Sequence, residues 1–335
     1  MVVDRRKFVA GLVLGVTAAC STGVQGRTEP AGGWWRLYKQ RFLDRSGRIV
    51  DTGNGGISHS EGQGYGMVLA ALSSDQDAFA AMARWTDANL ATAGDDLYAW
   101  RYDPRQANPV SDPNNATDGD ILIAWALALA GTAWQNSAYL DRSQHLRAAI
   151  RRDCVVDRFG RALLLPGRIG FAEAGQVMVN PSYYVWPALD MFARLDGAAT
   201  WGPVISSGEA LLRQARFGPL HLPCDWVSVT GSTAVAPARD KPSRFGFDAI
   251  RVPLYAQMGR RTALVRDVGG WWRAVQAQHR PVPAWIDVVT GEEAPYPVSS
   301  GGAAIIAKLT GTSAPMQLDS DYFAASLQML AAARV

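Results

Sequence analysis

The sequence predicts an all-α protein built as a two-layer helical barrel. Its 335 residues contain about eleven segments with helical periodicity, and these segments arrive largely in pairs. Residues 118–134 are apolar on all sides, and residues 136–152, which follow them, have one apolar face. An all-apolar helix needs neighbours on most sides, whereas an amphipathic helix can cover it from outside. We find no splitting linker and no repeat of 20–50 residues, so a closed barrel is favoured over an open solenoid.

The helices follow from apolar spacing and from start signals. Ser60 is placed to cap the second helix and Thr117 the fourth, because their hydroxyl oxygens can accept first-turn N–H groups. Asn180-Pro181-Ser182 is expected to start the sixth helix. In chain order, the expected helices are 34–43, 60–72, 76–90, 118–134, 136–152, 180–195, 201–216, 247–258, 261–279, 300–309 and 319–332.

The remaining segments are predicted as loops with short strands. Residues 27–33 have the composition of a linker. Residues 93–116 have no helical period and are rich in aromatic side chains, which favours a long loop that lines a functional surface. Short strands are expected at 162–165, 176–179 and 226–229, and a hairpin at 285–291.

The first 26 residues have the three-part form of a secretory signal. Arg5, Arg6 and Lys7 precede an apolar run, 9–19, and the paired arginines resemble a twin-arginine leader. The run is short for a membrane span, so a retained anchor is the lesser alternative. We therefore expect an exported protein, periplasmic or secreted, with one domain over 27–335. The sequence leaves open whether Cys20 is lipidated and whether Cys154 and Cys224 form a disulfide.

The composition limits the classes of partner. Charged residues make up 19% of the chain and the net charge is +3, part of it from the leader, which argues against nucleic acid as the main partner. The 12 tryptophans suit flat, weakly polar ligands such as sugar rings. The four histidines are scattered, with no metal-ligand spacing, and there is no nucleophile elbow and no phosphate loop. We therefore expect no catalytic metal and no organic cofactor.

Four segments place polar side chains at helix starts. Glu61, Asp118 and Tyr183 lie at or near the starts of three helices, and Asp248 and Arg251 share one face of a fourth. A single acidic residue there is usually dipole compensation, and an isolated Asp–Arg pair usually a surface ion pair. In a helical barrel, however, the inner helices start at one common end, so these side chains would converge. Paired carboxyl groups, an arginine and aromatic walls are what glycoside hydrolysis requires.

These segments also resemble a known family. Residues 116–134, which begin Ala-Thr-Asp-Gly-Asp, resemble the signature of glycoside hydrolase family 8, with a mild departure at Ala128. Residues 60–67, 180–183 and 248–251 match further segments of that family, in the family's order. The resemblance covers nearly the whole chain after the leader. The compact length is similar to that of the periplasmic endoglucanases that accompany bacterial cellulose synthases.

The resemblance implies an (α/α)6 barrel that cleaves β-1,4-linked glycans with inversion. By motif match, Glu61 is the general acid and Asp248 the general base. Asp118 binds and distorts the sugar at the cleavage point, and Tyr183 and Arg251 help to place the attacking water and Asp248.

The implied aromatic platforms for sugar rings are Trp100, Tyr102 and Trp226. Inversion requires room for water, so we expect the carboxyl groups of Glu61 and Asp248 to lie roughly 6.5–9.5 Å apart. We expect a monomer that binds a β-1,4-glucan, with a cellulose synthase complex as a possible partner.

Three alternatives remain open. The same chemistry can act on chitosan, xylan or mixed-linkage β-glucan. A protein of another class, a non-catalytic glycan-binding partner of a polysaccharide synthase, would typically lack the acid or the base. A polysaccharide lyase on a similar barrel would need an anionic substrate and a more basic groove.

Overall fold

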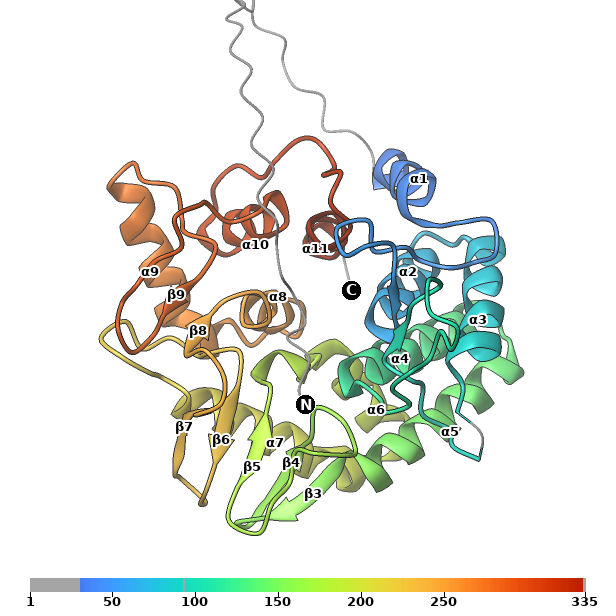
Figure 1. Ribbon diagram of the computed structural model, residues 1–335, viewed down its shortest axis with the longest axis horizontal. Helices are drawn as coiled ribbons and strands as arrows, with labels where there is room; N and C mark the ends of the chain where they lie inside the picture. The colour runs from blue at the N-terminus through green and yellow to red at the C-terminus, as the bar shows by residue number, and fades with distance from the viewer. Residues whose placement is uncertain (1–30, 93, 334–335) are drawn as a thin grey trace, which may run out of the picture.

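The computed structural model describes residues 31–92 and 94–333. Eleven α-helices lie in the described part of the chain, arranged in two layers (Figure 1). The inner helices are α2 (Ser60–Leu72), α4 (Thr117–Ala133), α6 (Trp186–Asp196), α8 (Arg251–Met258), α10 (Ser300–Thr310) and α11 (Tyr322–Ala332). Each inner helix contacts the next one, and α11 contacts α2, so the inner ring is closed.

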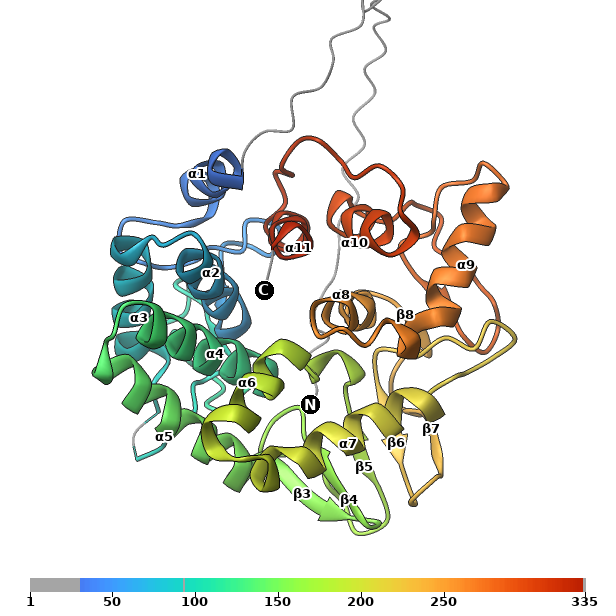
Figure 2. The ribbon, with the colours of Figure 1, turned by 180° about the vertical axis from the view of Figure 1, so that it is seen from behind.

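The outer layer follows from the amphipathic helices. It consists of α1 (Ala31–Phe42), α3 (Gln76–Leu90), α5 (Ser137–Asp153), α7 (Ala198–Gln214) and α9 (Arg266–Ala277). The view from behind shows the same ring, with these five helices outside it (Figure 2). Between α10 and α11, segment 311–321 crosses without a helix. This is the predicted (α/α)6 barrel, with that segment in the place of one outer helix.

The strands are short and lie in the connections. β1 (Ser58–His59) pairs with β2 (Arg101–Tyr102), and β3 (Val155–Arg158) with β4 (Arg161–Leu164), both antiparallel. β5 (Val177–Val179), β6 (Val227–Val229) and β7 (Val235–Pro237) form one antiparallel sheet. β8 (Arg244–Phe245) pairs with β9 (Ile286–Asp287). The first strand of the expected hairpin at 285–291 therefore pairs mainly with a strand that is distant in the sequence. β3 to β7 lie near α7 at the lower edge of Figure 1.

Large aromatic side chains fill the core between the two layers. Trp125, Trp186, Trp201 and Trp272 are almost fully buried. On the inner side, the helices approach one another closely at small residues. A Cβ atom on Gly62 of α2 would lie 2.5 Å from the Tyr322 hydroxyl of α11, so only glycine permits this contact.

Several expected boundaries were wrong. Residues 180–195 are not one helix: a 3-10 turn, η1 (Pro181–Tyr183), precedes α6, because the backbone of residues 184–185 is not helical and the helix restarts with Pro187 in the first turn of α6. The eighth helix starts at Arg251 rather than 247. Residues 261–279 comprise a 3-10 turn, η2 (Thr262–Val265), and α9.

Two further points from the sequence concern the first residues and the cysteines. The expected linker 27–33 ends inside α1, because that helix begins at Ala31 and is anchored by Trp35, Tyr38 and Phe42; the rest of the linker and the signal segment 1–26 lie outside the described residues. Cys154 and Cys224 are free, buried thiols rather than a disulfide. No helix in the described ranges is long and apolar enough to cross a membrane.

Candidate active site

The starts of the inner helices carry the predicted polar residues. Glu61 and Asp118 lie in the first turns of α2 and α4, and Arg251 is the first residue of α8. The two expected hydroxyl caps were wrong. His59 and Ala116 occupy the cap positions, and neither makes a side-chain cap hydrogen bond. Ser60 lies one residue inside α2 instead, and its hydroxyl has no hydrogen-bond partner among the described residues.

One guanidinium group, that of Arg251, joins all three carboxyl groups. Its Nη2 donates to Asp248 Oδ1 at 2.6 Å, and its Nη1 donates to Asp118 Oδ2 at 2.9 Å. Nη1 also forms an ion pair with Glu61 Oε2. Three segments, the outermost of which lie 190 residues apart in the chain, therefore meet at a single cation.

Burial separates the roles of these side chains. The side chains of Arg251 and Asp118 are each only 1% exposed, whereas those of Glu61 and Asp248 are 12% and 21% exposed. Glu61 and Asp248 can therefore meet a substrate or water, while Asp118 and Arg251 form the floor. This division fits two reacting carboxyl groups above a fixed pair of opposite charges.

The Arg251 guanidinium keeps its positive charge inside the cluster. Burial alone would lower the pKa of Arg251, but the charges of Glu61, Asp248 and Asp118 raise that pKa well above its ordinary value. The guanidinium therefore stays positive while three carboxyl groups surround it.

Two tyrosines belong to the cluster and were missed from the sequence. Arg251 Nη1 lies 3.2 Å from the Tyr65 hydroxyl, to which the Tyr255 hydroxyl donates at 3.3 Å. Burial raises the pKa of both phenols, so they remain neutral. Helical spacing could have found them, because Tyr65 is four residues after Glu61 and Tyr255 four after Arg251.

Tyr183 and Trp226 lie side by side at the same end. The Arg251 guanidinium carbon is 5.7 Å from the centre of the Tyr183 ring. Trp226 packs edge-on against Tyr183, with ring centres 6.5 Å apart, and stacks on Phe171 at 6.1 Å. The structure thus places Trp226 next to the carboxyl cluster, together with Phe171, which sequence patterns did not indicate.

The rings of Trp100 and Tyr102 contact residues outside the carboxyl cluster. The Trp100 ring stacks on His59, the residue that precedes α2, and its Nε1 donates to Asp112. Tyr102 instead packs edge-on against Trp85 of the outer helix α3. The role of both rings as sugar platforms stays a prediction, with Trp100 the better placed because it borders the start of α2.

Asp120, the second carboxyl group of the 116–120 segment, turns away from the cluster. Its oxygens accept hydrogen bonds from the Tyr98 N–H at 3.0 Å and from Asn115 Nδ2 at 2.8 Å. Asp120 therefore holds the chain that leads to Trp100 against α4. Burial raises the pKa of Asp120 to about 8, so this carboxyl is mostly neutral at pH 7.

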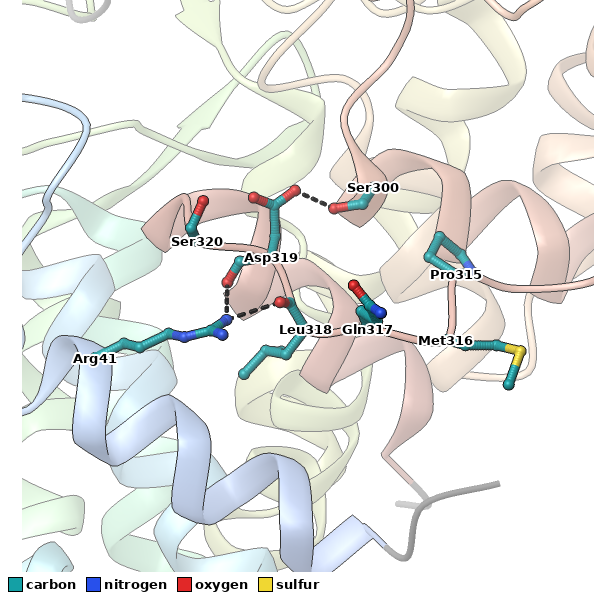
Figure 3. Close-up of a pocket in the computed structure, with 8 residues that line it drawn as sticks. All are labelled: Arg41, Ser300, Pro315, Met316, Gln317, Leu318, Asp319 and Ser320. Atoms are coloured by element: carbon teal, nitrogen blue, oxygen red, sulfur yellow. Dashed lines mark hydrogen bonds between the residues drawn. The ribbon is translucent and has the colours of Figure 1, made fainter. Parts of the chain in front are cut away.

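A surface cavity lies elsewhere at the rim of the barrel. It has a volume of about 690 Å³ and is lined by Arg41, Ser300 and residues 315–320. Figure 3 shows Arg41 hydrogen-bonded to the backbone oxygens of Leu318 and Asp319. None of the carboxyl groups around Arg251 lines it. In the described ranges, no group of three or more histidine, cysteine, aspartate or glutamate side chains is arranged to hold a metal ion.

Comparisons with known proteins identify the family of this chain. The family model described as glycosyl hydrolases family 8 matches residues 7–334. The chain belongs to glycosyl hydrolase family 8. An endoglucanase from Cellulomonas uda is 40% identical over 81% of this chain and 75% of the relative. A probable endoglucanase from Novacetimonas hansenii is 38% identical over 88% of both chains.

Solved structures show the same fold at similar identity. The structure of an endo-beta-1,4-glucanase from Acetobacter xylinum is 36% identical, has a TM-score of 0.85, and covers 91% of this chain and 97% of its own. This member of family 8 is therefore a glycoside hydrolase with the (α/α)6 barrel, as the sequence predicted.

Proposed function

We propose that this protein is an endo-β-1,4-glucanase that hydrolyses internal β-1,4-glucosidic bonds with inversion, with Glu61 as general acid and Asp248 as general base. The observation that carries the proposal is the Arg251 guanidinium, which binds Glu61 and Asp248 through different nitrogens. Two partly exposed carboxyl groups held at a fixed separation are what inversion needs. The 36–40% identity to endoglucanases supports the choice of polymer.

Each residue of the cluster has a defined task in this reaction. Glu61 gives its proton to the glycosidic oxygen as the bond to the anomeric carbon breaks. Water attacks that carbon from the opposite face, and Asp248 takes the proton that the water loses. Asp118, at the floor of the site, accepts hydrogen bonds from the sugar at the cleavage point. Tyr183 and Arg251 place the water and hold Asp248 in position.

The reaction is tested on soluble polymers with matched variants. Purified protein is incubated with carboxymethylcellulose, chitosan and xylan while viscosity and reducing ends are followed. Glu61→Gln and Asp248→Asn each lose the proton-transfer group, so we expect activity to fall about 10²–10⁴-fold. The exposed Glu292→Gln and Asp240→Asn serve as controls and should retain full activity.

The outcomes separate the alternatives. A rapid viscosity drop on carboxymethylcellulose with the α-anomer formed first supports the proposal. Activity confined to chitosan or xylan keeps the mechanism and changes the substrate. Full activity of Glu61→Gln refutes the assignment of the acid, and no activity on any polymer favours a glycan-binding partner of a polysaccharide synthase.

The cellular setting is a further part of the proposal. The leader with Arg5 and Arg6 supports export, so the enzyme would act in the periplasm or outside the cell, as a monomer and without a cofactor. Its proposed partner is a cellulose synthase complex, whose product is the polymer that this site would cut. Unchanged cellulose yield and fibre packing after deletion of the gene would count against this partnership.

A further inference from the structure

A fourth carboxyl group, that of Asp225, lies directly behind the general base. It belongs to the segment before β6, far from α8 in sequence. Its Oδ1 accepts hydrogen bonds from three backbone N–H groups, those of Gly246 (3.1 Å), Asp248 (3.2 Å) and Ala249 (2.7 Å). One carboxyl oxygen therefore anchors the whole turn that presents the Asp248 side chain.

The helix that follows this turn, α8, lacks a side-chain cap of its own. Residue Ile250, which precedes α8, makes no side-chain cap hydrogen bond. Asp225 instead accepts from N–H groups of the turn that precedes α8, and its own N–H donates to the Arg244 oxygen at 2.7 Å. Gly246 leaves room for this arrangement, because a Cβ atom there would lie 2.8 Å from Asp225 Oδ2.

We propose that Asp225 is a positioning residue for the general base: it fixes the turn that carries Asp248 and does so as an uncharged hydrogen-bond acceptor. The proposal rests on the assignment of Asp248 as the base. A neutral carboxyl group can accept all three N–H bonds at Oδ1 and carry its proton on Oδ2. In this form it holds the turn without adding a second negative charge beside Asp248.

The surroundings of Asp225 fit a neutral group. Within the described ranges, no lysine or arginine forms an ion pair with it. The nearby guanidinium groups are engaged elsewhere, since Arg251 binds Asp248 and Arg244 lies over the Trp285 ring at 3.6 Å. On its own segment, the Cys224 thiol donates to the Trp226 oxygen.

Electrostatics point the same way. Burial and the charge of Asp248 raise the pKa of Asp225 to about 7, although the three backbone N–H groups oppose the rise. From β9, Asp287 adds negative charge near Cys224 and supplies no compensating cation. An ionised Asp225 would therefore face the carboxylate of Asp248, and retaining its proton removes that repulsion.

The same segment also connects the base to the aromatic side of the site. Trp226, the next residue, packs edge-on against Tyr183. A shift of Asp225 would thus displace Asp248 and loosen the contact that supports the Tyr183 ring. Small displacements of this kind can cost about 10²-fold in rate, because the base must be aligned with the attacking water.

Two substitutions distinguish the loss of the hydrogen-bond acceptor Oδ1 of Asp225 from the loss of its negative charge. Asp225→Asn keeps Oδ1 and stays neutral, so we expect kcat within about threefold of the native enzyme and an unchanged acidic limb of the pH profile. Asp225→Ala removes the acceptor, so we expect kcat to fall roughly 10- to 100-fold with KM little changed. Asn136→Ala removes the cap of the outer helix α5 and controls for a purely structural loss.

The outcomes distinguish this inference from the proposed reaction. An inactive Asp248→Asn with a fully active Asp225→Ala overturns the positioning role and leaves the reaction intact. Equal losses in Asp225→Asn and Asp225→Ala show that a charged Asp225 is required, which also overturns the inference. An active Asp248→Asn together with an inactive Asp225→Asn makes Asp225 the base and refutes both. If Asp225→Ala only lowers the melting temperature, as Asn136→Ala should, Asp225 is structural.

Discussion

At the scale of single residues, Arg251 determines whether the carboxyl cluster can exist. Replacing it by methionine keeps a similar length but leaves Glu61, Asp118 and Asp248 without their cation. We expect Arg251→Met to lose about 3–5 kcal/mol of unfolding free energy, as when one partner of a buried ion pair is removed. Urea unfolding of the native protein and of the variant measures it.

The control for this prediction is another arginine with two carboxylate partners. Arg261 pairs with Asp190 and Glu209, but all three side chains are partly exposed. Arg261→Met should therefore cost only about 1 kcal/mol. Equal losses for Arg251→Met and Arg261→Met would show that the carboxyl cluster does not depend on its buried cation.

The residue scale also shows what sequence could predict. Glu61, Asp118, Asp248 and Arg251 were expected to converge because each lies at or near the start of a helix, and the structure brings them together. Asp225 was missed, because its three hydrogen bonds go to backbone N–H groups 21–24 residues away and leave no periodic signal. The catalytic roles of Glu61, Asp118, Asp248 and Arg251 stay predictions.

At the scale of elements, the close contact between α2 and α4 fixes the acid relative to the floor of the site. A Cβ atom on Gly119 would lie 2.1 Å from Ser60 Oγ and 2.7 Å from the Glu61 nitrogen. Gly119→Ala must therefore push the two helices apart. We expect it to cost about 1–3 kcal/mol of stability and to lower kcat, since Glu61 and Asp118 move relative to each other. Thermal unfolding and kcat on carboxymethylcellulose measure both effects.

A glycine of the outer layer provides the matched control. Gly270 lies inside α9, is exposed, and a Cβ atom there would meet nothing within 4 Å. Gly270→Ala should stabilise the protein by about 0.5–1 kcal/mol, because alanine favours the helix, and should leave kcat unchanged. A destabilised Gly270→Ala, or a Gly119→Ala enzyme with native stability and activity, would contradict this account of the contact.

Element boundaries show where local patterns stop being informative. The existence of each helix followed from apolar spacing, but the start at 247 was four residues early, because Asp225 holds that turn from a distance. The pairing of β8 with β9 joins segments about 40 residues apart, so a local reading of 285–291 could only suggest a hairpin.

At the scale of the whole molecule, buried acids set how stability depends on pH. The pKa values of Asp120 and Asp225 are raised to about 8 and about 7, because burial disfavours their charged forms. The folded state thus binds these protons more tightly than the unfolded state. Their contribution is fully present below about pH 4 and is lost as pH rises through 7 to 8.

Other carboxyl groups act in the opposite direction. Burial would raise the pKa of Asp75 and of Asp196, but hydrogen bonds from Lys39 and from Arg147 outweigh it and lower both pKa values. Their contribution is present above about pH 4 and is lost on further acidification. We therefore expect maximal stability in mildly acidic solution, at roughly pH 4–6, and a decline toward pH 8.

Asp120→Asn tests the origin of that decline, because an amide cannot ionise. The variant loses one hydrogen bond and should be less stable at pH 5, but its stability should fall less steeply between pH 5 and pH 8. Asp196→Asn is the counterpart, since it should reduce only the loss of unfolding free energy on the acidic side of the maximum. Unfolding free energies at intervals from pH 3 to pH 9 give both slopes. Parallel curves for the native protein and Asp120→Asn would mean that Asp120 is already ionised in the fold, and that the chain leading to Trp100 is held against α4 by a charged carboxylate.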